Sequence, residues 1–159
     1  MPRFPLPEAA RAIVGASGDA VAAAVAGDRH SFDEATAQLA ALDGERVRLV
    51  LGYVVRSLLE ELHPDGLSAD DLRDVLPRCF RVAAAWYPEV DATLLVVVLS
   101  NALGIGDQDD EPRQAEPADV TVHAALLIAD LVKASGRPLA GHLDAAIAEI
   151  ARAQTIELP

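Results

Sequence analysis

The sequence contains few aromatic residues and only one cysteine. Phe, Trp and Tyr make up 4% of its 159 residues, and the single thiol belongs to Cys79. One cysteine excludes an internal disulfide and a thiolate-rich metal site, and it suits a reducing compartment such as the cytoplasm. The hydrophobic share of 52% is rich in alanine, which has the best helix propensity, so we expect a core of closely packed helices.

Basic residues are scarce as well. Thirteen Lys and Arg stand against 25 Asp and Glu, which gives a formal net charge of −12. Such a surface repels phosphate backbones and anionic lipid, so we expect neither nucleic-acid binding nor membrane binding. Prolines interrupt the opening residues, MPRFPLP, where an export signal would need an unbroken apolar segment, so we expect a cytoplasmic protein. The abundance of Ala, Val, Leu, Arg and Asp is typical of proteins from GC-rich bacterial genomes.

Linear motifs of catalysis and cofactor binding are missing. There is no glycine-rich phosphate loop after a strand, no serine-centred nucleophile elbow and no His-Glu-x-x-His. Glu60 and His63 have the Glu-x-x-His spacing of di-iron bundles, but a second copy is absent and His63 is better placed as a helix cap before Pro64. The acidic run DQDDE could hold calcium weakly, although such runs are usually only solvated. We therefore expect no metal and no cofactor.

The most apolar run, DATLLVVVLSNALGIG, covers residues 91–106. Its apolar part is too short to cross a bilayer, which takes roughly 20 residues as a helix. A strand would need partners, and no second convincing strand is present. The run therefore predicts a helix that ends at Gly104. Because residues 94–103 are apolar nearly all round, we expect them to form the central buried helix.

Capping residues, glycines and prolines divide the rest of the chain. Ser31 with Glu34, and Ser68 with Asp71, predict capping boxes at two helix starts. Pro77 lies within one apolar stripe and should kink or split its helix. The predicted helices cover residues 7–27, 31–42, 45–63, 68–86, 92–103, 118–135 and 138–154.

These elements predict an all-α fold. We expect one domain, residues 1–159, built as a helical bundle of about seven helices with a central apolar helix. Residues 104–117, GIGDQDDEPRQAEP, combine five acidic residues with one arginine, two glycines and two prolines. This composition predicts a mobile, solvated acidic connector.

Helical spacing gives each polar candidate an expected place. Cys79 falls on an apolar stripe, so we expect a packed core thiol. His123 and Asp130 lie seven residues apart on one helix face, as an acid–base pair would, but neighbouring polar residues make this face look solvent-exposed. Asp74 and Arg78 are expected to pair at i, i+4 on another wet face.

Three aromatic residues are the candidate pocket or interface residues. Tyr53, Trp86 and Tyr87 are the large rings available to line a pocket or anchor a partner, because aromatics dominate interface energetics. For Trp86, packing in the core is the simpler interpretation.

The function that the sequence favours is a non-enzymatic protein–protein interaction or self-association module, acting as a homodimer. Wide apolar helix faces exceed what a small bundle can bury, and a two-fold contact is the commonest way to cover them. The alternative is a helical, sensor-like domain that binds an apolar small molecule in a pocket between helices. An enzyme is the third class considered.

Overall fold

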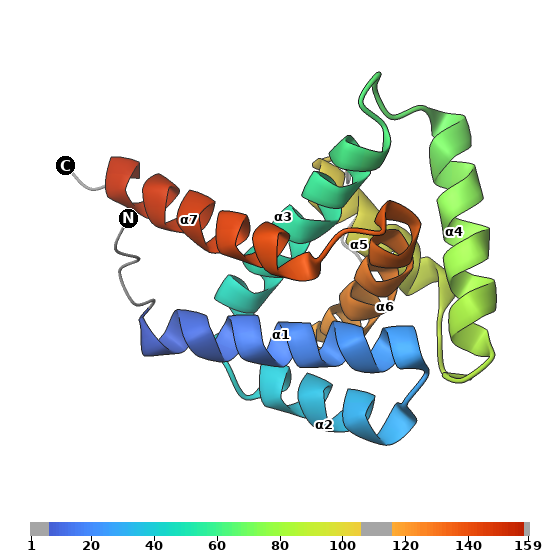
Figure 1. Cartoon of the computed structure of the whole chain (residues 1–159), viewed down its shortest axis with the longest axis horizontal. Coiled ribbons are helices and arrows are strands. Elements are labelled where there is room, and N and C mark those ends of the chain that lie inside the picture. The colour runs from blue at the N-terminus through green and yellow to red at the C-terminus, as the bar shows by residue number, and fades with distance from the viewer. Residues whose placement is uncertain (1–6, 106–115, 158–159) are drawn as a thin grey trace.

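A computed structural model describes residues 7–105 and 116–157, with side chains to residue 153. Within these residues the chain forms one packed all-α bundle without a strand, as predicted (Figure 1). The helices are α1 (Glu8–Ala26), α2 (Arg29–Ala40), α3 (Gly44–Leu62), α4 (Ala69–Ala84), α5 (Ala92–Leu103), α6 (Pro117–Ser135) and α7 (Leu139–Glu157).

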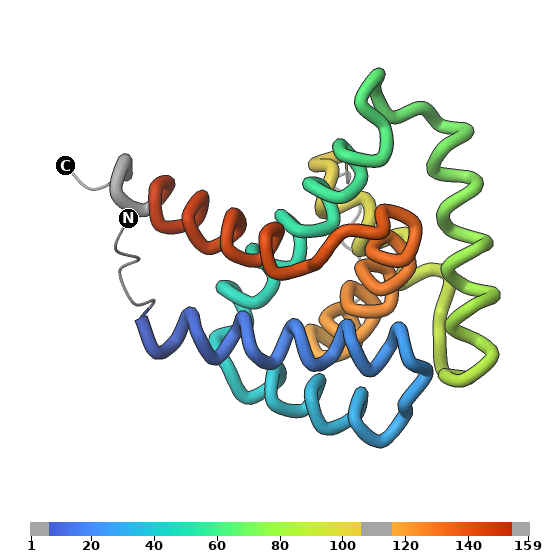
Figure 2. The backbone as a smooth tube through the Cα atoms, viewed as in Figure 1, coloured from blue at the N-terminus to red at the C-terminus, as the bar shows by residue number. Residues whose placement is uncertain are grey.

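Helix α6 is the centre of the bundle. It packs against α1, α2, α3, α4 and α5, and its nine consecutive residues from His123 to Leu131 are all buried. The backbone trace shows α1 and α2 as a hairpin along one edge, α4 along another, and α7 crossing near α3 (Figure 2). The core is therefore organised around α6, whose ends are set by Pro117 and by Gly136 in the left-handed conformation.

The prediction that residues 94–103 form the central buried helix is wrong. Only Leu95, Val98 and Leu99 of α5 are buried, whereas Val96 is 46% exposed. Helix α5 has α3, α4 and α6 as neighbours, and they cover one side of it. An apolar helix is buried only as far as its neighbours surround it, so composition alone misplaced the centre of the bundle.

Helix starts follow the expected capping chemistry, with one correction. The capping box of Ser68 and Asp71 is present at the start of α4. The predicted box at Ser31 is wrong, because α2 begins earlier and Asp28 is its N-cap, accepting from the backbone N–H of Ser31. Asp28 follows Gly27, whose left-handed conformation ends α1 and turns the chain directly into α2.

Pro77 does not split α4. The helix is continuous from Ala69 to Ala84 with Pro77 inside it. Pro77 is exposed, so the carbonyl of Arg73, which loses its helical partner at this proline, lies on the side of the helix open to water. The exposed setting makes the missing hydrogen bond tolerable.

The predicted mobile connector, residues 104–117, lies mostly outside the described residues, and only its ends are seen, as the C-cap Gly104 and the helix start Pro117.

Helix α1 is the one described helix whose length and composition would suit a membrane span, and 39% of its apolar window is buried inside the bundle. Its buried side chains include Ile13, Ala20 and Val21, and the helix packs on α2 and α6.

Candidate functional site

Two of the three predicted aromatic residues lie together, away from the third. Trp86 and Tyr87, just after α4, meet Phe32 of α2 in edge-to-face contacts, with ring centroids 5.1 Å (Phe32–Trp86) and 5.5 Å (Phe32–Tyr87) apart. Phe32 is fully buried, and the other two rings are half-buried. This cluster joins the end of α4 to α2, so its rings are used mainly for packing.

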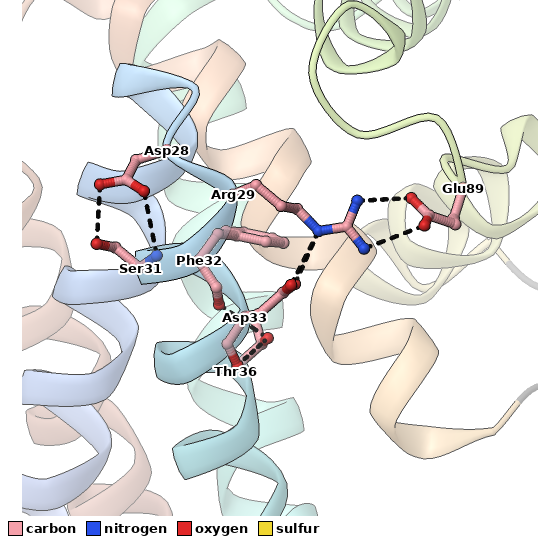
Figure 3. A network of polar contacts seen from close by, with 7 residues as sticks. All are labelled: Asp28, Arg29, Ser31, Phe32, Asp33, Thr36 and Glu89. Atoms are coloured by element: carbon pink, nitrogen blue, oxygen red, sulfur yellow. Dashed lines mark hydrogen bonds and ion pairs between the residues drawn. The ribbon is translucent and has the colours of Figure 1, made fainter.

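A polar network centred on Arg29 lies beside the aromatic cluster, and Figure 3 shows it with Phe32, one ring of that cluster. Arg29 donates to Asp33 and, through both terminal nitrogens, to Glu89, with N–O distances of 2.8 and 3.1 Å for the Glu89 pair. Its guanidinium also lies 4.3 Å from the centre of the Tyr87 ring. The hydrogen bonds from Arg29 lower the pKa of Glu89. The network fastens the α4–α5 loop to α2, and the pocket beside Trp86 is only about 20 Å³ in volume.

Tyr53 lies elsewhere, on a surface groove between α3, α5 and α6. Two adjoining pockets of about 440 and 670 Å³ form this groove, and they share Arg48, Asn101, Val120 and Thr121. The residues that define the α3–α5–α6 groove are Arg48, Leu49, Gly52, Tyr53 and Arg56 of α3, Val97, Asn101 and Ala102 of α5, and Val120 and Thr121 of α6. Pockets of this volume are in the range that binds ligands or partner side chains.

The groove is apolar at its base and carries charged side chains along α3. Leu49 is 46% exposed, although it is a large aliphatic residue. Arg56 donates to Glu60 on its own helix at 3.0 Å, and Arg48 has no ion pair with any other described residue. The α3 side of the groove thus carries both signs of charge, with Arg48 unpaired among the described residues and Glu45 beside the second pocket.

Gly52 leaves an opening in the α3 wall of the groove. A Cβ atom at this position would meet nothing within 4 Å. Gly52 lies inside a regular helix, where glycine costs about 0.5–1 kcal/mol relative to alanine. The backbone of α3 is therefore accessible at this point to a side chain from outside the molecule.

The prediction that His123 and Asp130 face solvent is wrong. Their relative exposures are 3% and 8%, because both lie in the stretch of α6, residues 123–131, that neighbouring helices bury. His123 accepts at Nε2 from the backbone N–H of Asp91 at 3.0 Å, so its Nδ1 carries the proton and donates to the carbonyl of Asp119 at 2.7 Å. The imidazole thus links the start of α5 to α6, and the two predicted partners do not interact as an acid–base pair.

Asp130 binds Arg78 of α4 instead. Arg78 donates to both carboxylate oxygens, the shortest N–O distance being 2.7 Å, so the predicted Asp74–Arg78 pair is wrong. The next residue, Cys79, is buried as predicted, with its Sγ 3.7 Å from the carbonyl oxygen of Leu126. Burial, and then the negative charge of Asp130, raise the pKa of the Cys79 thiol to about 12. The thiol is therefore protonated and unreactive at neutral pH.

A serine, a histidine and a glutamate converge where α7 crosses α3. His142 Nε2 donates to Glu61 Oε2 at 2.8 Å, and its Nδ1 accepts from the Ser57 hydroxyl at 2.8 Å. Arg137 also contacts Glu61, at 3.1 Å. Sequence reasoning missed this cluster because His142 is 85 residues from Ser57; the only local signal was Ser57 and Glu61 at i, i+4.

The contacts resemble the order of a hydrolytic triad, but other parts of such a site are not beside them. Ser57 is in the middle of α3, where backbone N–H groups are committed to the helix, and none of the three residues lines the α3–α5–α6 groove. A triad needs free donors for the oxyanion and room for substrate. The cluster therefore serves as a polar clamp between α3 and α7.

The groove is thus the best candidate functional site in the part of the chain that the structure describes. Within the same residues, no group of three or more His, Cys, Asp or Glu is arranged to hold a metal ion. The groove offers apolar contact, two arginine side chains and an open backbone position, which suit binding. Comparisons with protein-family models, with curated proteins and with solved structures gave no match.

Proposed function

We propose that the chain is a self-associating helical interaction module and that the α3–α5–α6 groove is its contact surface. The observation that carries this proposal is the combination of an exposed Leu49 with the open position at Gly52, side by side on one face of α3. An exposed aliphatic side chain next to an apolar depression favours association, since both surfaces lose water when a partner covers them.

The aromatic residue of the groove supports the same proposal. Tyr53 is half-buried and carries a hydroxyl, so it can pack its ring against a partner while the hydroxyl stays near water. The net charge of −12 would keep a dimer soluble and limit further growth into larger assemblies. We place the protein in the cytoplasm as part of the same proposal, on its cysteine usage.

A small apolar molecule is the second candidate occupant. The volume of the first pocket, about 440 Å³, favours it, because ligand sites commonly enclose 300–1,000 Å³. Asn101 and Thr121 would orient such a ligand by hydrogen bonds. In that case the groove would bind a ligand without a change in the mass of the protein.

Light scattering after gel filtration, over a range of micromolar concentrations, tests the proposal. We expect a mass near twice 16.7 kDa for the wild type. Gly52→Leu should yield monomer, because the new side chain fills the groove, and should keep the fold, because its Cβ meets no neighbour. Ala145→Leu, at an exposed position on α7 outside the groove, is the control and should remain dimeric. A wild-type mass near 16.7 kDa throughout would refute self-association.

A further inference from the structure

The exposed face of α3 carries an ordered series of charges and apolar groups. Glu45 lies near the start of the helix, Arg56 lies eleven residues later, and Leu49 and Gly52 lie between them. Glu45, Leu49 and Arg56 are exposed, and Gly52 is half-buried. Steps of four, three and four residues keep these four positions on one helix face. The face thus has Glu45 near one end and, toward the other, Arg56 with its ion-pair partner Glu60 one turn further on, and it has a projection and an opening between Glu45 and Arg56.

We infer that the partner is a second copy of this chain, with the two α3 helices antiparallel and Leu49 of each lying over Gly52 of the other. This inference rests on the proposed self-association. In an antiparallel two-fold pair, every contact occurs twice. Placing position 49 opposite position 52 also places Glu45 opposite Arg56, because both pairs of numbers have the same midpoint. The apolar fit and the charge match therefore demand the same register.

The same register gives Arg48 a partner. Arg48 comes opposite Tyr53 of the second copy, and it has no ion pair with any described residue of its own chain. A guanidinium over a tyrosine ring is a favourable contact, and one already exists in this molecule between Arg29 and Tyr87. One alignment thus produces an apolar contact, an ion pair and a cation–π contact, and the two-fold symmetry makes each of them twice.

Other alignments of the two helices are less favourable. An antiparallel pair centred on Gly52 brings Arg48 against Arg56, and a parallel pair brings each arginine against its own copy. A shift that pairs Arg48 with Glu60 leaves Leu49 opposite Leu59, which is already buried in its own chain. Like charges at an interface oppose association, so the register with Leu49 over Gly52 is preferred.

Charge reversal tests this register. Glu45→Arg and Arg56→Glu each place two like-charge pairs in the dimer, so each single variant should raise the dimer dissociation constant roughly tenfold or more. The double variant Glu45→Arg/Arg56→Glu should restore wild-type association. An equimolar mixture of the two single variants should form a heterodimer, because each variant then meets the opposite charge at both positions. Analytical ultracentrifugation measures all four samples, and circular dichroism verifies that each is folded.

The outcomes separate this inference from the proposal on which it rests. A wild type that is monomeric into the high-micromolar range overturns both. A wild-type dimer that neither single variant weakens overturns the register and leaves self-association standing. Two weakened single variants that fail to associate when mixed also overturn the register, because the two positions then do not face each other. Arg73 of α4 is, like Arg56, an exposed arginine, but it lies outside the groove. Arg73→Glu is therefore the matched charge control and should associate like the wild type.

Discussion

Helices α5 and α6 differ in a way that their sequences do not suggest. Helix α5, ATLLVVVLSNAL, has no charged residue, yet only three of its twelve residues are buried. Helix α6, PADVTVHAALLIADLVKAS, includes two aspartates, a histidine and a lysine, yet nine consecutive residues are buried. Burial in this bundle follows the number of neighbouring helices, because α6 is in contact with five and α5 with three. The more polar helix is the core.

The polar residues of α6 are compatible with the core because each has a partner. His123 uses both ring nitrogens, one on the backbone of Asp91 and one on its own helix. Asp130 receives a forked pair of hydrogen bonds from Arg78. Buried polar groups are tolerated when they are hydrogen-bonded. These residues therefore tie α6 to its neighbours instead of marking a face toward water.

The largest effect should come from a charge placed in α6. Leu127 is fully buried, so Leu127→Asp leaves an unpaired carboxylate in the core and should cost more than about 4 kcal/mol. We expect a chain without a cooperative thermal transition by circular dichroism. Val97→Asp, which is at the groove in α5 and only half-buried, is the companion variant and should stay folded with a lower melting temperature. An equal loss of stability from both substitutions would contradict the difference in burial between α5 and α6.

The contact between α4 and α6 predicts a smaller effect, which depends on pH. The pKa of Cys79 is raised from 9.0 to about 12 in the folded protein, chiefly by burial. The protonated thiol contributes fully to the free energy of unfolding below pH 9. This contribution is lost as pH rises from 9 toward 12, because in that range Cys79 ionises only in the unfolded chain. At pH 10 the loss should be about 1 kcal/mol.

Denaturant unfolding at pH 8 and pH 10 measures this loss. Cys79→Val, which lacks the thiol, is the reference, and the wild type should lose more stability between the two pH values than this variant. An equal loss in both proteins would show that burial does not perturb the thiol. The native thiol should also resist alkylation at neutral pH and react only after unfolding.

The sequence was sufficient to predict the helices and their number. Local rules set the helix ends, such as the Ser68–Asp71 capping box and the stop at Gly104. The same rules could not place the helices around one another, because this depends on contacts between residues far apart in the chain. Asp130 binds Arg78, which is 52 residues away in the sequence. The helical pattern of α6 could not show that α4 places a guanidinium beside this carboxylate.

The candidate site was harder to predict than the fold. The scarcity of large rings pointed to Tyr53, which does lie on the groove, but it also made candidates of Tyr87 and of Trp86, for which core packing was already the simpler interpretation. Those two rings meet Phe32, whose burial depends on the α1–α2 hairpin folding against them. Gly52 was not among the predicted site residues, because a glycine indicates a binding surface only when the space around it is known.

The smallest effect should come from the same kind of change made on the outer side of α5. Val96 is 46% exposed and does not line the groove, so Val96→Asp should change the free energy of unfolding by less than about 0.5 kcal/mol. This is a severe test, because the substitution interrupts the most apolar run in the sequence, LLVVVL. The same variant should self-associate like the wild type if the groove is the contact surface. A large loss of stability would mean that α5 is covered as α6 is, and a fully folded variant that no longer dimerises would move the contact surface from the groove to the outer side of α5.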